Sequence, residues 1–155
     1  MTENISKEKL KSFVDSAGIN NEVNEVGDCV TTIKGNSDFG YDVIVNFMVH
    51  DGWIKIKGFS PDLGLVVLSK NLPELEREKR ANYLMLQCHH WNLQTIWPKA
   101  FVSLKRANVF GEYNLFINKH VSNAFVITNC ILRPYHSVWD LFCALNKALK
   151  TNGLL

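Results

Sequence analysis

The sequence predicts an α+β fold in which an antiparallel sheet of two hairpin blocks packs against helices. Apolar residues recur with a helical period in Ser6–Ala17, Pro73–Trp91 and Ser137–Lys150, and the segments between them alternate with a period of two. Asp51-Gly52 is a strong signal for a two-residue hairpin turn, because both positions favour positive φ. The expected order is α-β-β-β-α-β-β-(β)-α, and the 155 residues suffice for a single domain over residues 1–155.

The first helix is expected to begin after Ser6, whose side chain can cap it. It should end before Gly18, which readily adopts the left-handed conformation. Its apolar stripe consists of Leu10, Phe13, Val14 and Ala17. Looser alternation predicts a strand over Glu22–Ile33, followed by a turn at residues 35–38.

Tyr41–His50 is the clearest strand of the chain. The side chains that share its apolar face are Tyr41, Val43, Val45, Phe47 and Val49. Trp53–Phe59 is expected to return antiparallel to it, with Gly58 as a candidate bulge. Leu65–Leu68 is continuous and apolar, and is interpreted as a short fourth strand.

The middle helix places Pro73 at its first position, where a missing N–H costs nothing. Glu76 and Arg80 are spaced to form an ion pair on a solvated face. The side chains expected on its buried side are Tyr83, Leu84, Leu86, Cys88 and Trp91. Trp97-Pro98 should prevent further helix, because a residue before proline disfavours the helical conformation.

Lys99–Lys105 alternates and predicts the first strand of the second block. A loop around Asn108 and Gly111 should lead to a return strand over Tyr113–Asn118. The next segment, Phe125–Leu132, is open between a strand, favoured by its β-branched residues, and a helix broken by Pro134. The last helix, Ser137–Lys150, is expected to be capped by Ser137, with a stripe of Val138, Leu141, Phe142, Leu145 and Leu149.

Composition and charge argue against a secreted protein, a membrane protein and a nucleic-acid-binding protein. The polar N-terminus has no apolar core of a signal peptide, and no stretch approaches the length of a membrane span, so we expect a cytoplasmic protein without membrane contact. A net charge of +2 with scattered lysines argues against nucleic acid as the partner. The four cysteines lack a CxxC pair and are expected to be buried thiols.

Neither a metal site nor a catalytic set is predicted. Cys88, His89 and His90 are consecutive, and on a helix they would point about 100° apart, so they cannot converge on one ion. The sequence contains no nucleophile elbow or phosphate-binding loop. We therefore expect no cofactor, no metal and no enzymatic activity.

The second face of the sheet carries the candidate site. If the stripe of Tyr41–His50 faces the helices, alternation turns a second set of large apolar side chains the other way. These residues are Ile44, Met48, Trp53, Phe101 and Phe116. There are two alternatives for such a group. A helix, the segment Phe125–Leu132 or a second copy of the chain covers it, or it forms a face that binds a partner.

Two short segments carry a family resemblance. His90-Trp91-Asn92-Leu93, followed by Trp97-Pro98-Lys99-Ala100-Phe101-Val102, resembles the YbjN-like family, which shares its fold with type III secretion chaperones, and Gly111-Glu112-Tyr113 would open the next strand. The similarity spans roughly Ser6 to Lys150, and the chain departs from it at Asn123–Leu132. The resemblance implies a small cytoplasmic protein without catalytic residues, often dimeric, which either holds an extended client segment or has a regulatory role.

These observations lead to three hypotheses. The first is a non-catalytic, chaperone-like or regulatory homodimer that holds a protein partner on the apolar sheet face, since alternate side chains of an extended segment can enter pockets there. The second is a small-molecule sensor or enzyme that uses a pocket between sheet and helices. The third is nucleic-acid binding through strand aromatics and lysines such as Lys55 and Lys57, which the low net charge disfavours.

Overall fold

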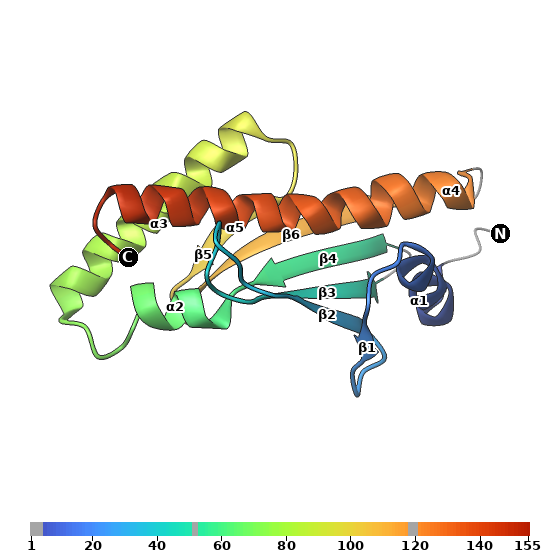
Figure 1. The fold of residues 1–155 in the computed structure, drawn as a ribbon, viewed down its shortest axis with the longest axis horizontal. Helices are drawn as coiled ribbons and strands as arrows, with labels where there is room; N and C mark the ends of the chain where they lie inside the picture. Colours follow the sequence, from blue (N-terminus) through green and yellow to red (C-terminus); the bar gives the residue numbers. More distant parts are fainter. Residues whose placement is uncertain (1–4, 51–52, 118–120) are drawn as a thin grey trace.

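A computed structural model describes residues 5–50, 53–117 and 121–155. It confirms the α+β class: six strands form one antiparallel sheet in the order β1-β2-β3-β4-β6-β5. Helix α5 runs across this sheet, with α1 towards one end and α3 towards the other (Figure 1). The elements are α1 (Lys7–Ser16), β1 (Glu22–Val23), β2 (Cys29–Ile33), β3 (Val43–His50), β4 (Trp53–Phe59), α2 (Pro61–Val67), α3 (Glu74–Gln94), β5 (Lys99–Ser103), β6 (Asn108–Phe116), α4 (Asn123–Phe125), the π-helix η1 (Val126–Leu132) and α5 (Arg133–Thr151).

Helix α1 agrees with its prediction at both ends. The Ser6 hydroxyl accepts a hydrogen bond from the Lys9 backbone N–H at 3.2 Å, and Gly18 follows the helix with a φ of 73°. The predicted strand Glu22–Ile33, by contrast, is two strands, β1 and β2. The Asn24 side chain accepts from the backbone N–H of Asp28 and closes a turn between them, so the chain reverses within the predicted strand.

Strands β3 and β4 pair from Ile44 opposite Phe59 to His50 opposite Trp53, as the alternation predicted. The turn signal Asp51-Gly52 lies outside the described residues. Gly58 is not a bulge, because it pairs in regular register with both Val45 and Gly111. Its lack of a side chain makes room for α5: a Cβ there would lie 2.1 Å from Val138 Cγ1.

The predicted fourth strand, Leu65–Leu68, is wrong, since these residues belong to helix α2 and its C-cap. Pro61 occupies the start of that helix, where its fixed φ suits a helical turn. Leu63 and Val67, four residues apart, are buried on one side, and Leu65 is exposed. A period of 3.6 therefore accounts for this apolar run better than a period of two.

Helix α3 shows the predicted ion pair between Glu76 and Arg80, with 2.8 Å between Oε1 and Nε. Leu84 and Cys88 are buried as expected. Leu86 is not: it points about 200° away from Leu84 around the helix and is 48% exposed. The helix ends at Gln94, before Trp97-Pro98.

Strand β6 begins earlier than predicted. Asn108 and Gly111 lie within it and pair with Ser103 and Ala100, and the chain turns instead at residues 104–107. The far edge of β5 is covered by α3. The Asn92 side chain accepts from the Ala100 N–H at 2.7 Å and donates to the Ala100 carbonyl at 2.8 Å, so it bonds both backbone groups of an edge residue.

Residues 123–151 form one continuous helical segment, which settles the open assignment of Phe125–Leu132 as helical. The predicted cap is wrong: Ser137 lies inside α5, and Ser122 caps the segment by accepting from the Phe125 N–H at 3.2 Å. Pro134 does not break the helix, because the preceding turns are π-helical and leave room for its ring. The predicted stripe of α5 is buried in full: Val138, Leu141, Phe142, Leu145 and Leu149.

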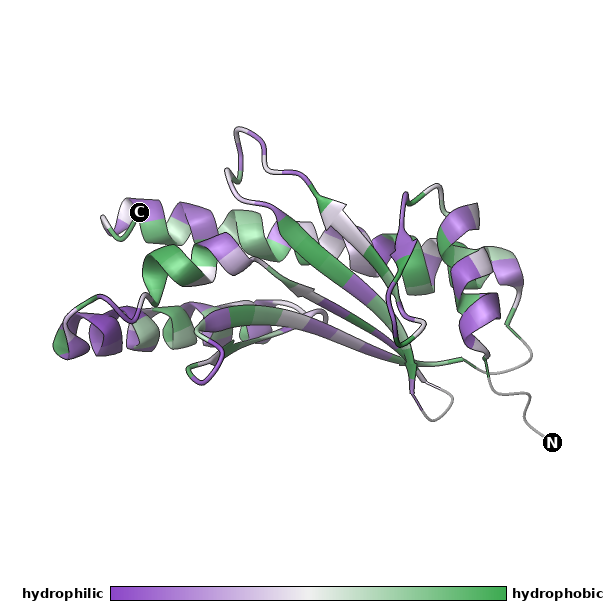
Figure 2. Ribbon diagram, turned by 90° about the horizontal axis from the view of Figure 1, so that it is seen from below, coloured by the Kyte–Doolittle hydropathy of each residue, from purple (hydrophilic) through white to green (hydrophobic). Residues whose placement is uncertain are grey.

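One hydrophobic core lies between the inner face of the sheet and the helices. Val43, Val45 and Phe47 of β3 are fully buried, as are Ile54 and Ile56 of β4. Seen at right angles to the first view, α5 lies on one side of the sheet (Figure 2). The side chains on the other side of β3 and β4 are absent from the core cluster. We call that side the outer face.

Candidate functional site

All five residues predicted for the partner-binding site lie on the outer face. The cross-strand register places Met48 beside Lys55, Trp53 beside Phe116, and Ile44 beside Phe59. Phe101, on β5, joins the same face opposite Phe110. Trp53 is 46%, Phe116 58% and Phe101 39% exposed, and none of the five packs against the core. The five residues therefore share one face of the sheet, as the alternation predicted.

Two groups of aromatic rings stand at the two ends of β4. At one end, the rings of Trp53 and Phe116 are 5.3 Å apart between centroids. At the other, the Phe110 ring lies 5.6 Å from Phe59 and 5.4 Å from Phe101. Edge and offset ring contacts at these separations stabilise each pair.

Sequence reasoning missed Phe59 and Phe110 as members of this face. The sequence predicts a loop at Phe110, because Asn108 and Gly111 are residue types typical of turns. Once β6 begins at Asn108, alternation back from Phe116 places Phe110 on the outer face. It is only 4% exposed, yet it lies outside the core cluster, so its neighbours on the outer face bury it.

Charged side chains separate the two aromatic groups. Lys55 Nζ lies 2.7 Å from Glu112 Oε1, and the Asn114 side chain donates to the same oxygen at 3.0 Å. Burial by itself raises the pKa of Glu112, but these hydrogen bonds outweigh it and hold that pKa below its usual value.

Lys57 lies over the second aromatic group. Its Nζ is 4.2 Å from the centroid of the Phe110 ring, which is within the range of a cation–π contact. Burial lowers the pKa of Lys57, and the nearby positive charge of Arg106 adds to this effect. The ammonium group is therefore partly dehydrated and held between rings and cations.

Helix α3 presents a second exposed apolar surface, which we call the α3 stripe and define as Leu75, Leu86 and Leu93. Leu75 is 80% and Leu93 71% exposed. At 100° per residue the three side chains lie within about 20° of one another, opposite the buried Leu84. The three leucines are 11 and 7 residues apart, so they form a sparse apolar line along one side of this 21-residue helix.

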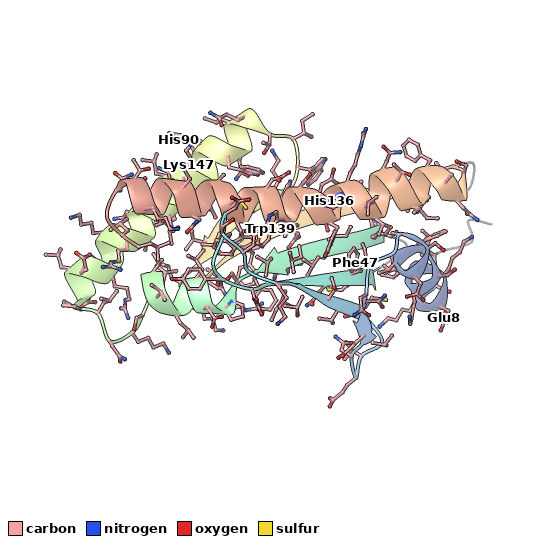
Figure 3. The ribbon with its side chains drawn as sticks, in the orientation of Figure 1. Glu8, Phe47, His90, His136, Trp139 and Lys147 are labelled. Atoms are coloured by element: carbon pink, nitrogen blue, oxygen red, sulfur yellow. The ribbon has the colours of Figure 1, made fainter. Side chains whose placement is uncertain are left out.

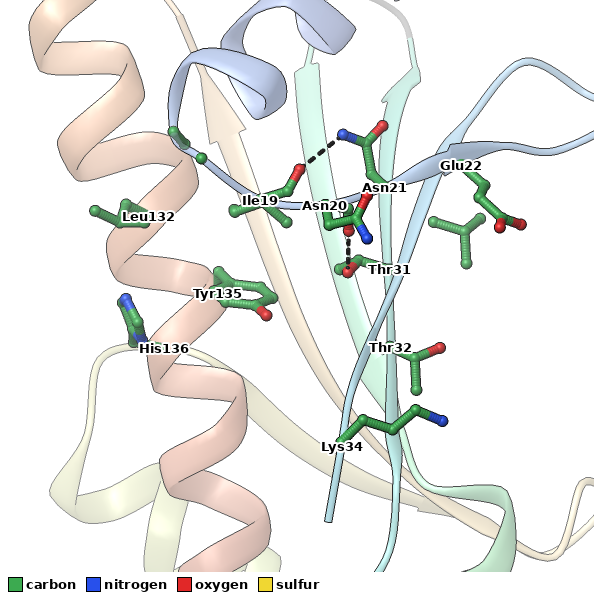
Figure 4. Close-up of a pocket in the computed structure, with 13 residues that line it drawn as sticks. Ile19, Asn20, Asn21, Glu22, Thr31, Thr32, Lys34, Leu132, Tyr135 and His136 are labelled. Carbon is green, nitrogen blue, oxygen red and sulfur yellow. Dashed lines mark hydrogen bonds between the residues drawn. The ribbon is translucent and has the colours of Figure 1, made fainter. Parts of the chain in front are cut away.

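A groove of about 620 Å³ lies between the edge of β2 and helix α5. Figure 4 shows Tyr135 and His136 on its helical side and Thr31 and Thr32 on its strand side. The Thr31 hydroxyl donates to the Asn20 carbonyl at 2.6 Å and closes one end. Burial raises the pKa of the Tyr135 phenol above its ordinary value.

Within residues 5–50, 53–117 and 121–155, no three His, Cys, Asp or Glu side chains are arranged to hold a metal ion. His90 and His136 project from different helices (Figure 3). Cys29, Cys88 and Cys130 are buried free thiols, as predicted, and Cys143 is half-buried. Burial raises the pKa of Cys88 to about 12, which makes it a poor nucleophile.

Comparisons with protein-family models, with curated proteins and with solved structures found no match. The resemblance to the YbjN-like family therefore stays a prediction. Among the helices of the described residues, none is both long and apolar enough to cross a membrane.

Proposed function

We propose that this chain is a non-catalytic, cytoplasmic binding module that holds a segment of a protein partner on the outer face of its sheet. One observation supports the proposal: large apolar side chains lie on one face of the sheet, outside the core, in two groups at the two ends of β4. Trp53, Phe101 and Phe116 remain well exposed there. Aromatic residues in such a position commonly supply most of the binding energy of an interface.

We further propose that the protein acts as a homodimer through the α3 stripe. Leu75, Leu86 and Leu93 are too exposed to contribute to the core of one chain. In an antiparallel pair of α3 helices, Leu75 of one copy can face Leu93 of the other, so the spacing is self-complementary.

The test of the proposed function compares two double variants in partner capture. Trp53→Ser with Phe101→Ser removes apolar groups from the outer face, and Leu75→Ser with Leu93→Ser removes a similar amount from α3. Cross-linking to the parent identifies the partner proteins. The first variant should no longer capture them, whereas the second should, and the thermal unfolding temperature of the first variant should equal that of the parent. Retained capture would contradict the proposal, and so would unfolding of the first variant, because it would place these residues in the core.

The groove beside β2 supports a second candidate, a small-molecule sensor. It lies between the sheet and a helix, and its polar groups converge from the residue 17–22 segment, β2 and α5. Native mass spectrometry of the purified protein tests this candidate, and we expect it to detect a retained ligand. His136→Trp should displace that ligand, whereas the control His90→Trp, on α3, should not.

A further inference from the structure

Along β4, the outer face has aromatic side chains at both ends and lysines between them. Its outward side chains are, in order, Trp53, Lys55, Lys57 and Phe59. The partners across β6 are Phe116, Asn114, Glu112 and Phe110. Aromatic rings therefore stand at both ends of two adjacent strands, with polar and charged groups between them. The ends are six positions apart on each strand, or about 20 Å at ~3.4 Å per residue.

Positive charge exceeds negative charge between the rings. Glu112 already pairs with Lys55, and Asp42, at the rim, pairs with Lys34 at 2.7 Å. Lys57 gathers with Arg106 around the Phe110 ring, at 4.2 and 5.8 Å from its centroid. The centre of the outer face is thus suited to a carboxylate that approaches from outside.

We infer that the segment held on the outer face is an extended acidic peptide with two large apolar side chains six residues apart. This inference rests on the proposed function and names its partner. In an extended chain, residues at even spacing point to the same side. The apolar side chains would contact the Trp53 and Phe101 ends. Of the acidic side chains at the second and fourth positions between them, one would face Lys57 and the other Lys55, which it would share with Glu112.

The same features fit a single nucleic-acid strand less well. Stacking platforms place aromatic side chains under successive bases, and a basic groove follows the phosphates. Here the aromatic ends are about 20 Å apart, and the residues between them are an ion pair, an amide and a lysine. The net charge of +2 adds little general attraction for a polyanion.

The experiment uses fluorescein-labelled synthetic peptides and fluorescence anisotropy with the full chain. The probe has the sequence Phe-Ser-Glu-Ser-Glu-Ser-Phe. One control replaces both Glu by Lys, a second replaces both Phe by Ser, and an oligothymidylate represents single-stranded nucleic acid. We expect the probe to bind at least about tenfold more tightly than either control peptide, with an affinity that falls as salt is added.

A charge exchange tests the role of Lys57. Lys57→Glu should weaken the acidic probe at least about tenfold and strengthen the lysine peptide. Lys150→Glu, on the exposed end of α5, makes the same change in net charge and should alter neither. Circular dichroism and thermal unfolding verify that both variants fold.

Four outcomes overturn the inference. In one outcome, the acidic and lysine peptides bind the parent equally and neither binds Trp53→Ser. That result would show no charge preference, and it would leave the proposed function intact. Equal effects of Lys57→Glu and Lys150→Glu would show only a net-charge effect. Tighter binding of the oligothymidylate would assign the face to nucleic acid and contradict both proposals. Failure of every probe to bind would overturn the inference alone, because partner capture tests the proposed function separately.

Discussion

Gly58→Ala provides the strictest test of which sheet face carries the helices. Gly58 is the last residue but one of β4 and pairs with Val45 on one side and Gly111 on the other. A methyl group there would lie 2.1 Å from Val138 Cγ1, far inside the separation of about 3.5–4.0 Å that carbon atoms prefer. Val138 is fully buried, so it cannot turn into solvent. Either α5 moves outwards or β4 bends, and overpacking of this kind costs about 1–3 kcal/mol.

We expect the upper end of that range, about 3 kcal/mol, because both contacting groups are fixed by their backbones. Urea unfolding followed by tryptophan fluorescence measures the loss. Gly40→Ala is the matched control, since a Cβ at Gly40 meets nothing within 4 Å. It should leave the free energy of unfolding within about 0.5 kcal/mol of the parent.

Val138→Ala completes a double-mutant cycle with Gly58→Ala. On its own, Val138→Ala removes buried methyl groups and should cost about 1–2 kcal/mol. In the Gly58→Ala background it removes the clash, so the two changes together should cost less than their sum by at least about 1 kcal/mol. Additive losses, or equal losses for Gly58→Ala and Gly40→Ala, would refute the packing of α5 on β4 and with it the distinction between inner and outer faces.

Three further predictions concern the edges and surfaces of the fold. Cys88 should not react with a disulfide reagent at about pH 8 until the protein is unfolded. Its pKa is 9.0 in the unfolded chain and about 12 in the folded one, so above pH 9.0 the thiol ionises only in the unfolded chain, and the free energy of unfolding should fall as pH rises. Asn92→Ala should cost about 2 kcal/mol and speed hydrogen exchange at the Ala100 amide, whereas Asn92→Asp, which keeps one acceptor, should cost less. Leu86→Glu should convert the dimer to a monomer by light scattering, and its thermal unfolding, unlike that of the dimeric parent, should not depend on protein concentration. A parent chain that is already monomeric would refute the role of the α3 stripe.

Elements with a long, regular period were predictable from the sequence. The predicted stripe of α5 is buried in full, and the stripe of α1 and the inner face of β3 are buried apart from Ala17, Tyr41 and Val49, which are partly buried against the core. Burial selects one face of a regular element. Short apolar runs were not predictable. Leu65–Leu68 fits either period, and its tertiary packing favours the helix. Gly64 of that helix lies against the turn at Ala107: a Cβ on Gly64 would lie 2.3 Å from the Ala107 carbonyl oxygen.

Tertiary contacts also overrode local preference in the segment before α5. The β-branched run at Val126–Leu132 favours a strand, yet Val126, Cys130 and Ile131 are buried with a helical spacing against α1. In the candidate site, Gly111 indicated a loop. Its actual role is to admit α5, because a Cβ there would lie 2.7 Å from Leu141 Cδ2. The loop predicted around Gly111 makes β6 too short, so the predicted face lacks Phe110.

The two proposed surfaces are formed by different elements, and this makes them separable by measurement. The α3 stripe supplies no side chain to the outer face, which consists of residues from β3, β4, β5 and β6. A dimer through α3 would therefore carry two free outer faces. A partner with two acidic segments on a sufficiently long linker could bind both, and its affinity would exceed that of one segment by about 100-fold or more. Leu86→Glu should abolish that gain and leave the affinity for the single peptide unchanged. If the variant also weakens the single peptide, the stripe and the outer face form one binding surface, and the division of roles between them is wrong.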